Sequence, residues 1–176
     1  MIDFYTWPTP NGRKISIMLE ELGVEYKVHP IYIGQDEQKT PAFLEISTNN
    51  KIPAIVDHDN GLKLMESGAI LIYLAEKYGK FLPTDPLARA RANEWLMWQM
   101  AGLGPMLGQT HVYHRNNSGK AEFAEQRFLA ETARLYSVLD KRLSDRDYIV
   151  DEYSIVDIAC WPWVSRFEWH LSLIHI

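Results

Sequence analysis

Cysteine is nearly absent from this sequence of 176 residues, which contains a single one, Cys160. An internal disulfide, a Cys-x-x-Cys redox pair and a thiolate zinc site each need more than one cysteine, so the sequence excludes all three. Cys160 lies in an apolar helical pattern beside Trp161 and Trp163. We therefore predict a buried, inert thiol at this position rather than a nucleophile.

Basic charge and long apolar runs are also scarce. Lys and Arg number 18 against 23 Asp and Glu, which gives a formal net charge of −5. This balance argues against nucleic acid as a partner and gives no support for a polybasic membrane contact. The longest apolar runs, such as residues 68–72, are far shorter than the roughly 18 residues of a membrane span. The start, Met1–Tyr5, has neither a basic segment nor an apolar signal core, so we expect a cytoplasmic protein.

Short strands and helices alternate through residues 1–80. The apolar patterns predict strands at 2–5, 25–33, 53–57 and 63–65, and helices at 10–22, 41–46 and 67–78. Gly23 and Gly79 follow two of these helices as stop signals, and Asp59-Asn60-Gly61 is typical of a hairpin turn. The order βαβαββα predicts a mixed sheet with helices packed on it, as in a thioredoxin-like domain.

The second half of the sequence has an entirely helical pattern. Two prolines and two turn-forming residues make 81–87 a predicted linker, which separates a first domain, 1–80, from a helical domain, 88–176. Helical periodicity covers Leu87–Met106 and Ala121–Leu143, with a polar loop predicted at His114–Gly119. A last helix is predicted near Ser154, because Ser154 and Asp157 have the spacing of a capping box. The fold class is therefore α/β followed by all-α.

The segment Thr9-Pro10-Asn11-Gly12 separates the first predicted strand from the first predicted helix. Thr9 is a favourable N-cap and Pro10 suits the first helical position, so free backbone N–H groups and the positive end of the helix dipole gather here. An anion, including a ligand thiolate, is stabilised at such a point, and the Thr9 hydroxyl and the Asn11 amide could donate hydrogen bonds to it. Taken alone, this segment is explained better as a plain helix cap.

Asn49–Pro53 places a proline at the start of a predicted strand, where its missing N–H donor is harmless. A cis Ile52–Pro53 bond would turn the Ile52 backbone toward solvent, where its N–H and C=O could pair with an extended peptide. An ordinary trans loop proline is the alternative.

Glu66-Ser67 precedes a further predicted helix. Ser67 is predicted to cap that helix, and its hydroxyl and the first N–H groups would form a carboxylate site. Glu66 could accept a hydrogen bond from an ammonium group, so the pair suits an α-amino acid; a capped helix after an exposed Glu is the alternative. Taken together, the three segments would hold glutathione extended, with its sulfur near Thr9 and its γ-glutamyl end near Ser67.

Two further patterns carry no predicted chemistry. The glycines at 102, 104 and 108 miss the dinucleotide-binding fingerprint by one residue and follow no strand, so they indicate close helix packing or a bend. His111 and His114 lie three residues apart without a third ligand, so we predict no metal site.

Residues 1–80 resemble the glutathione-binding domain of glutathione S-transferases. The resemblance is carried by Asn-Lys-Ile-Pro-Ala at 50–54 and Glu-Ser-Gly-Ala-Ile at 66–70. The second half, with Trp-Leu-Met-Trp-Gln at 95–99 and Gly-Leu-Gly-Pro-Met-Leu-Gly-Gln at 102–109, resembles the bacterial nu class and its fungal nitrogen-regulator relatives. The Thr-Pro-Asn-Gly start at 9–12 is similar to the same class.

The resemblance implies a role for each matching residue. Thr9 and Asn11 would hold the glutathione sulfur, and Gln38 would contact the glycine end. Ile52, ahead of a cis Pro53, would pair through its backbone with the cysteinyl unit, and Glu66 and Ser67 would bind the γ-glutamyl group. Arg127 in the helical half matches a basic residue that reaches the glutathione pocket in this class, although Arg134, two turns along, could be confused with it.

The nu-class resemblance implies glutathione-dependent disulfide-bond reduction, with weak conjugation or peroxidase activity, no metal, and a homodimer. Since the chain has no nucleophilic cysteine, glutathione must supply the reactive sulfur as a cosubstrate, and a small disulfide or electrophile is the second partner. One alternative is a non-catalytic glutathione-binding or regulatory protein on the same fold. Another is an inactive fragment, because the tail Trp169–Ile176 does not resemble the family and the helical domain is expected to be truncated.

Overall fold

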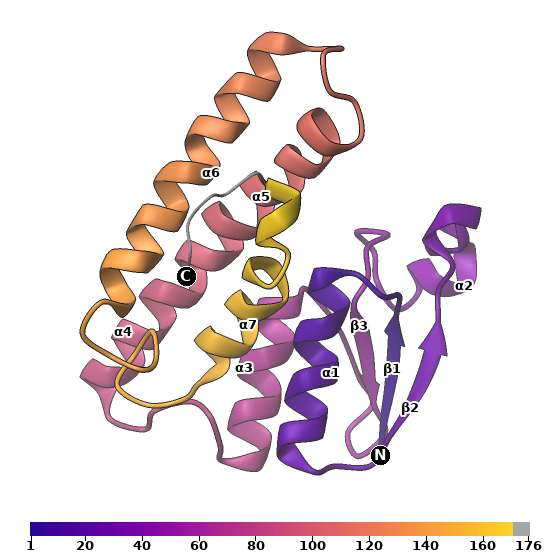
Figure 1. The fold of residues 1–176 in the computed structure, drawn as a ribbon. Helices are drawn as coiled ribbons and strands as arrows, with labels where there is room; N and C mark the ends of the chain where they lie inside the picture. The colour runs from indigo at the N-terminus through magenta and orange to yellow at the C-terminus, as the bar shows by residue number, and fades with distance from the viewer. Residues whose placement is uncertain (171–176) are drawn as a thin grey trace. The chain divides into compact units, whose positions relative to one another are not determined.

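A computed structural model describes residues 1–170, and the chain forms two compact units, the first Met1–Leu82 and the second beginning at Pro83. In the first unit the strands are β1 (Ile2–Thr6), β2 (Tyr26–Pro30), β3 (Ala54–Asp57) and β4 (Leu62–Met65), and the helices are α1 (Pro10–Leu22), α2 (Pro41–Leu44) and α3 (Ser67–Tyr78). The strand order is β2-β1-β3-β4, with β1 parallel to β2 and both other pairs antiparallel. This is the predicted thioredoxin-like arrangement (Figure 1).

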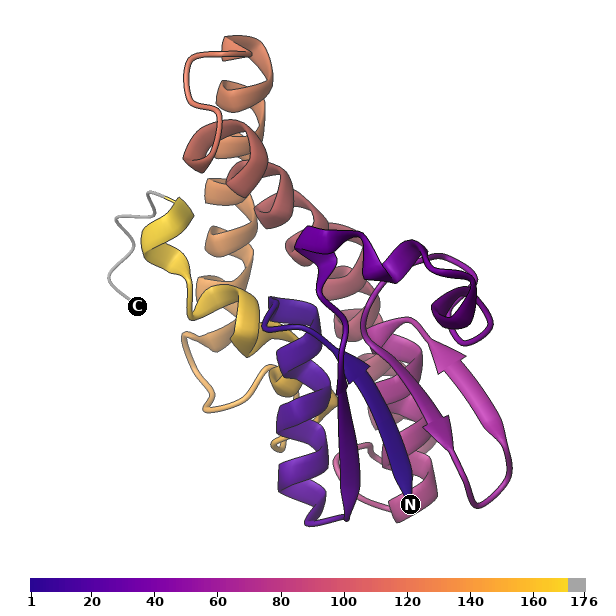
Figure 2. The same cartoon turned by 90° about the vertical axis from the view of Figure 1, so that its right-hand side faces the viewer.

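Helices α1 and α3 lie side by side on one face of the sheet (Figures 1 and 2). Residues from the helices and strands form the buried core of this unit, and they include Ile2, Phe4, Ile15, Met18, Leu19, Ile55, Ile70, Leu71 and Leu74. Each helix ends at a left-handed glycine, Gly23 (φ 67°) and Gly79 (φ 67°), as the stop signals predict. The bounds of α1 and α3 agree with the predicted ranges.

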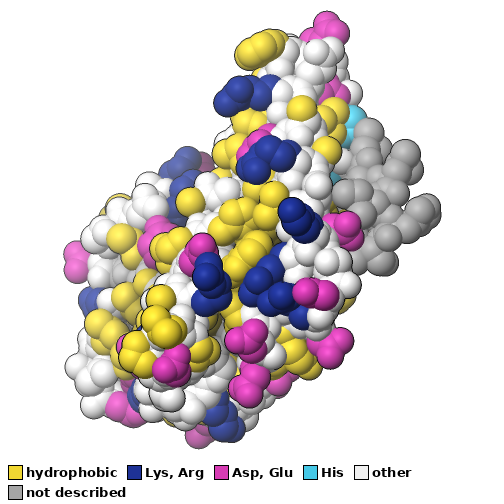
Figure 3. All heavy atoms as spheres, turned by 90° about the vertical axis from the view of Figure 1, so that its left-hand side faces the viewer, with side chains coloured by type: hydrophobic (Ala, Val, Ile, Leu, Met, Phe, Trp, Pro, Cys, Tyr) yellow, Lys and Arg dark blue, Asp and Glu magenta, His cyan; other side chains and the backbone are white. Residues whose placement is uncertain are grey.

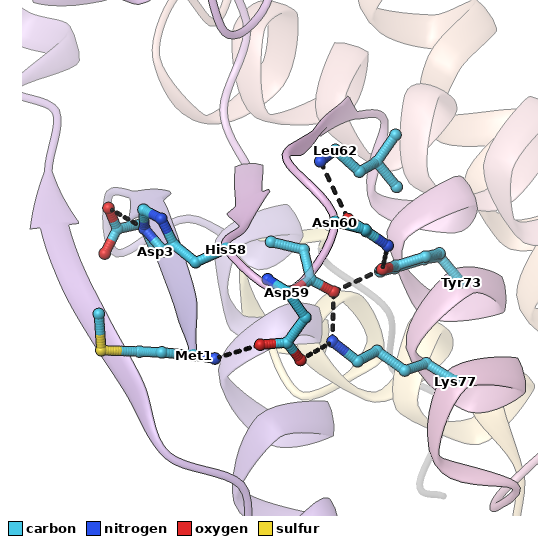
Figure 4. Close-up of polar contacts among 9 residues, drawn as sticks. Met1, Asp3, His58, Asp59, Asn60, Leu62, Tyr73 and Lys77 are labelled. Carbon is cyan, nitrogen blue, oxygen red and sulfur yellow. Dashed lines mark hydrogen bonds and ion pairs between the residues drawn. The ribbon is translucent and has the colours of Figure 1, made fainter.

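A network of charges ties the β3–β4 hairpin to α3 and to the amino terminus (Figure 4). The ammonium of Lys77 donates to Asp57 Oδ2 at 2.5 Å and to Asp59 Oδ2 at 2.6 Å. Tyr73 donates its hydroxyl proton to Asp57 Oδ2 at 2.5 Å, and the Met1 amine lies 3.1 Å from Asp59 Oδ1. Asp57 is completely buried, so these donors keep a charged carboxylate in the core.

The second unit is helical. Its elements are α4 (Pro86–Trp98), a π-helical turn (Gln99–Leu103), α5 (Gly104–Thr110), a second π-helical turn (His111–Arg115), α6 (Glu122–Leu143), α7 (Ile155–Val164) and a 3₁₀ turn (Phe167–His170). Helix α4 begins at Pro86, inside the segment predicted as the linker 81–87, because Asp85 caps it by accepting from the N–H groups of Leu87 and Ala88.

The predicted loop His114–Gly119 begins two residues late, because His114 and Arg115 belong to the π-helical turn. Glu125 holds this segment: it accepts from Gly119 N at 2.8 Å and Ser118 Oγ at 2.9 Å, and lies 2.6 Å from His114 Nδ1. These hydrogen bonds, chiefly that from Gly119, lower the pKa of Glu125 to about 2.

Other predictions for this unit are confirmed. Ser154 and Asp157 form a capping box at the start of α7, and Cys160 is buried. A Cβ on Gly104 would lie 3.2 Å from Trp163 Nε1, so this glycine does allow close helix packing.

No helix among residues 1–170 is long and apolar enough to cross a membrane. The expectation about the tail falls, for residues 171–176, outside the part of the chain that the structure describes.

Candidate functional site

The strand register gathers the three predicted binding segments at one end of the sheet. Tyr5, next to the last residue of β1, aligns with Ala54, the first residue of β3, and Ala54 aligns with Met65, the last residue of β4. The loops that follow or precede these positions carry Thr9, Ile52 and Glu66. Segments far apart in the sequence therefore lie together at one end of the strands of the first unit; this end of the sheet is called the edge below.

Thr9 caps α1 with an extended backbone (φ −110°, ψ 162°), and its Oγ1 accepts a hydrogen bond from Gly12 N at 3.1 Å. Gly12 is required for this turn, because a Cβ there would lie 2.4 Å from both Thr6 Oγ1 and the carbonyl oxygen of Trp7. Asn11 is half-buried at the second position of α1, in the first turn where backbone N–H groups have no helical acceptor. Both residues predicted to hold a sulfur thus lie at the positive end of one helix.

The loop before β3 presents an unpaired stretch of backbone. The Ile52–Pro53 bond is cis, and Pro53 is buried. Ser47 Oγ donates to the carbonyl oxygen of Lys51 at 2.8 Å, and Asn50 adopts a left-handed conformation (φ 46°). The N–H and C=O of Ile52 form no hydrogen bond with any residue in the range 1–170. An extended ligand can therefore pair with them as an added strand would.

The start of α3 differs from the prediction at one position. Ser67 is the first helical residue and not the N-cap, which is Glu66, a residue in a left-handed conformation (φ 71°). Glu66 has no side-chain capping bond; its Oε1 instead accepts from Asn49 Nδ2 at 3.3 Å, which links this site to the Ile52 loop. The first intrahelical bond runs from Ile70 N to Glu66 O, so the N–H groups of Ser67, Gly68 and Ala69 precede it.

The residue that sequence reasoning missed is Lys14. Its side chain is 1% exposed, and its Nζ donates to Ser67 Oγ at 3.3 Å, from the second turn of α1 to the first residue of α3. A polar residue in an amphipathic helix is ordinarily predicted to face solvent. The only signal in the sequence is that Lys14 directly precedes the buried Ile15 and lies four residues before Met18, on the edge of the apolar face.

Two further predicted residues, Gln38 and Arg127, lie outside these three segments of the sequence. Gln38 is half-buried in a 3₁₀ turn (Glu37–Lys39), where its Nε2 donates to Asp36 Oδ1 at 3.3 Å. Its Oε1 is buried and has no hydrogen-bond partner among residues 1–170.

Arg127 lies on α6 in the second unit and lines an open groove of about 710 Å³. Hydrophobic and basic side chains alternate along the upper, helical part of the face shown in Figure 3. Arg134 lines the same groove but is held by Glu131 through two hydrogen bonds, of 2.8 and 2.7 Å. Arg127 forms no hydrogen bond or ion pair with any described residue, so of these two arginines it is the one available to a ligand.

The fold and the edge define a class of protein, a thioredoxin-like domain with a binding edge. The edge presents the N-termini of α1 and α3 and the unpaired backbone of Ile52. These features suit an extended peptide that carries a thiol and a carboxylate. The sequence model of the glutathione S-transferase N-terminal domain matches residues 2–76. The chain is 52% identical over 173 residues to the disulfide-bond oxidoreductase YfcG of Escherichia coli, covering 95% of this chain and 80% of YfcG. It belongs to the glutathione S-transferase family and resembles its nu class.

A second relative in Escherichia coli, the disulfide-bond oxidoreductase YghU, is 44% identical over 176 residues. That alignment covers 94% of this chain and 60% of YghU. The chain therefore spans less than two thirds of YghU's length.

Solved structures agree with this assignment. A glutathione transferase from Pseudomonas putida, with one glutathione disulfide bound per subunit, is 46% identical with a TM-score of 0.88, covering 94% of this chain and 74% of that one. A Burkholderia graminis glutathione transferase, with two glutathione molecules per subunit, is 45% identical with a TM-score of 0.90, covering 95% and 72%. Ure2p in complex with glutathione is 29% identical with a TM-score of 0.93, covering 99% and 88%.

Proposed function

We propose that this protein is a glutathione-dependent disulfide-bond reductase, with weak conjugation or peroxidase activity. The observation that carries the proposal is the convergence of Thr9, Ile52 and Ser67 on one edge of a thioredoxin-like sheet. The 52% identity to the disulfide-bond oxidoreductase YfcG supports the choice of reaction. Two related structures that bind glutathione disulfide or two glutathione molecules support a site large enough for both thiols.

In this proposal glutathione binds in the extended form. Its sulfur lies near the Thr9 hydroxyl and Asn11 amide, and its cysteinyl backbone pairs with the N–H and C=O of Ile52, ahead of Pro53. The γ-glutamyl ammonium binds Glu66, and the γ-glutamyl carboxylate binds Ser67 and the N–H groups of α3.

Gln38 contacts the glycine end of glutathione, and Arg127 contributes a positive charge from the helical unit. Within residues 1–170 Arg127 forms no hydrogen bond or ion pair, and its charge acts on Glu131 only at longer range.

The protein's own residues lower the pKa of the bound thiol, because the helix terminus and the two donors stabilise sulfur as a thiolate. The thiolate attacks one sulfur of the substrate disulfide; a mixed disulfide forms and the other sulfur leaves as a thiolate, which takes up a proton. A second glutathione thiolate then attacks the glutathione sulfur of the mixed disulfide, releasing the second substrate thiol and glutathione disulfide. No protein cysteine takes part.

The decisive experiment measures glutathione-dependent reduction of a small dialkyl disulfide by the wild type and by Thr9→Ala/Asn11→Ala. Loss of two donors to a developing thiolate is expected to lower turnover by about 10²-fold or more. Thr9→Ser, which keeps the hydroxyl, is the matched control and should retain turnover. Unchanged turnover in the double variant would show that the proposed sulfur site is wrong.

A non-catalytic glutathione-binding protein is the second candidate, since the fold superposes on Ure2p in complex with glutathione with a TM-score of 0.93. A glutathione-affinity column tests binding, and the disulfide assay then separates the two: retention on the column without turnover favours the binding protein.

We also propose a cytoplasmic homodimer, on the basis of the family resemblance. Light scattering coupled to size-exclusion chromatography tests the dimer, and a monomeric mass at micromolar concentration would contradict it.

A further inference from the structure

We propose that a pocket between α1 and β2, beside Thr9, holds the departing half of the disulfide substrate, and that Arg13 selects substrates in which this half carries a carboxylate on an apolar body. The inference rests on the proposed function and names its substrate class. The pocket has a volume of about 310 Å³, at the lower end of the range for pockets that take small molecules. All of its lining residues belong to the first unit.

The pocket is open because no large side chain fills the space between α1 and β2. Gly12 and Ser16 lie four residues apart on one face of α1, and both are small. Across from them, Val28 aligns with the buried Phe4 of the neighbouring strand, yet it is 50% exposed on the outer strand β2. An apolar wall is therefore left in contact with water.

Most of the pocket wall is apolar. Trp7, Pro8, Val28 and Pro30 supply this surface. Trp7 packs against Tyr32, with ring centroids 4.4 Å apart, so one wall of the pocket is held in place. An apolar or aromatic group that binds here removes this surface from water, which favours binding.

Arg13 supplies the only charged group of the pocket lining. Its side chain is exposed, and it forms no hydrogen bond or ion pair with any residue in the range 1–170. None of the lining residues is acidic, so no carboxylate of the pocket neutralises the guanidinium. A guanidinium binds a carboxylate through two parallel hydrogen bonds. The pocket therefore suits an apolar group that ends in a carboxylate.

The pocket adjoins the proposed sulfur site. Gly12 lines it, and the N–H of Gly12 donates to Thr9 Oγ1 at 3.1 Å. Trp7 and Pro8, which also line it, directly precede Thr9. The glutathione thiolate at Thr9 attacks the nearer sulfur of the substrate disulfide, and the bond between the two substrate sulfurs breaks. The electron pair of that bond goes to the farther sulfur, which leaves as a thiolate in the pocket and takes up a proton from solvent.

The test compares two disulfides that differ in charge and have nearly the same size. Bis(p-carboxyphenyl) disulfide carries a carboxylate on each ring, and bis(p-carbamoylphenyl) disulfide carries a neutral amide there. Their glutathione-dependent reduction is followed by coupling to glutathione reductase, and the rate without the protein is subtracted. The wild type should have a kcat/KM about 10-fold higher for the acid, as expected for one charge-assisted contact. The difference should lie in KM, because Arg13 binds the carboxylate equally before and during sulfur exchange.

Three variants locate the effect. Arg13→Gln should raise KM for the acid about 10-fold and bring the acid-to-amide ratio of kcat/KM close to one. Val28→Trp, which fills the pocket from β2, should raise KM for both disulfides. Lys63→Gln is the matched control: it removes a positive charge from an exposed lysine on β4, the outer strand on the other side of the sheet, and should keep the wild-type ratio.

Equal kcat/KM for the two disulfides in the wild type, or a preference for the acid that persists in Arg13→Gln, would overturn this inference. An unchanged KM for both disulfides in Val28→Trp would show that the pocket is not where they bind. In these cases, reduction of a small dialkyl disulfide by the wild type would leave the proposed function intact. A wild type that reduces no disulfide with glutathione would instead overturn the proposed function, and this inference with it.

Discussion

The side-chain oxygen of Thr9 accepts a hydrogen bond from the backbone N–H of Gly12 at 3.1 Å. A hydroxyl that accepts in this way still has its own proton to donate. The same group can therefore cap α1 and donate to a sulfur bound at the helix terminus. At the start of α3 the hydroxyl of Ser67 accepts a hydrogen bond from the ammonium of Lys14 at 3.3 Å.

A substitution at Thr9 should show the effect of losing the hydroxyl without a change in the shape of the side chain. Thr9→Val keeps the shape but removes both the cap and the donor, so we expect a loss of about 1 kcal/mol in the free energy of unfolding and a large loss of disulfide turnover. Thr9→Ser should keep both. Urea denaturation and steady-state kinetics on the same samples measure the two effects. Full turnover by Thr9→Val would remove the hydroxyl from the mechanism.

Gly12→Ala should destabilise the first unit. The new Cβ would lie 2.4 Å from the carbonyl oxygen of Trp7, a backbone atom that cannot move without opening the turn. We expect a loss of about 1–3 kcal/mol, as for overpacking elsewhere, measured by urea denaturation. Gly34→Ala is the control, since a Cβ there meets nothing within 4 Å. Equal stability of the two variants would contradict the close approach.

The buried carboxylate of Asp57 should make Lys77 important for stability. Lys77→Met leaves this carboxylate without its ammonium, and we expect a loss on the order of 3 kcal/mol at neutral pH. Lys63→Met is the control at an exposed site. Burial by itself would raise the pKa of Asp57, but the hydrogen bonds from Lys77 and Tyr73 hold it below its ordinary value.

The pH dependence of the Lys77→Met deficit follows from that lowered pKa. The contribution of ionised Asp57 is complete above its unfolded pKa of about 4 and is lost as the pH falls through the lower folded value. The difference between wild type and Lys77→Met should therefore shrink between pH 7 and pH 3, as measured by urea denaturation. A deficit that is constant with pH would argue against the ion pair as its cause.

Two stacked histidines in the second unit should make the free energy of unfolding decrease as the pH falls below 6.5. His170 Nε2 lies 2.7 Å from His111 Nε2, and burial lowers the pKa of His111 to about 4 and that of His170 to about 3. Below pH 6.5 the unfolded chain binds protons that the folded pair refuses, so stability should fall by about 1.4 kcal/mol per pH unit for each histidine. His111→Gln should reduce this slope between pH 6.5 and pH 5. If the slope of stability against pH were the same in His111→Gln as in the wild type, the lowered pKa of His111 would be contradicted.

Local signals predicted α1 and α3 accurately because each ends at a residue in the left-handed conformation, which glycine adopts without strain. They failed where a partner decides the structure. The strand predicted at 25–33 ends at Pro30, because β1 ends at Thr6 and offers no further pairing. The helical segment after Pro86 continues to Arg115 through two π-helical turns, with Gly104 and Pro105 at the start of α5, directly after the first of these turns.

The local structure of the candidate site was predictable at Thr9, which caps α1 as its residue type indicates. The prediction was wrong at the start of α3, where the N-cap is Glu66 and not Ser67. Lys14 was not predictable, because its burial depends on the packing of α1 against α3, which brings residues 14 and 67 together. The same holds for the edge itself: the register Tyr5–Ala54–Met65 joins three segments that the sequence keeps apart. Tertiary contacts of this kind have no signature in a local pattern.

The most direct measurement of the central claim is the thiol pKa of bound glutathione, followed by thiolate absorbance in the ultraviolet as the pH is raised. The account predicts that the bound thiol ionises at least about one pH unit below free glutathione, whose thiol behaves like an ordinary cysteine with a pKa of about 8.5. Thr9→Val/Asn11→Ala should return the pKa of bound glutathione to that ordinary value. A wild-type complex whose thiol ionises at the pKa of free glutathione would contradict the account.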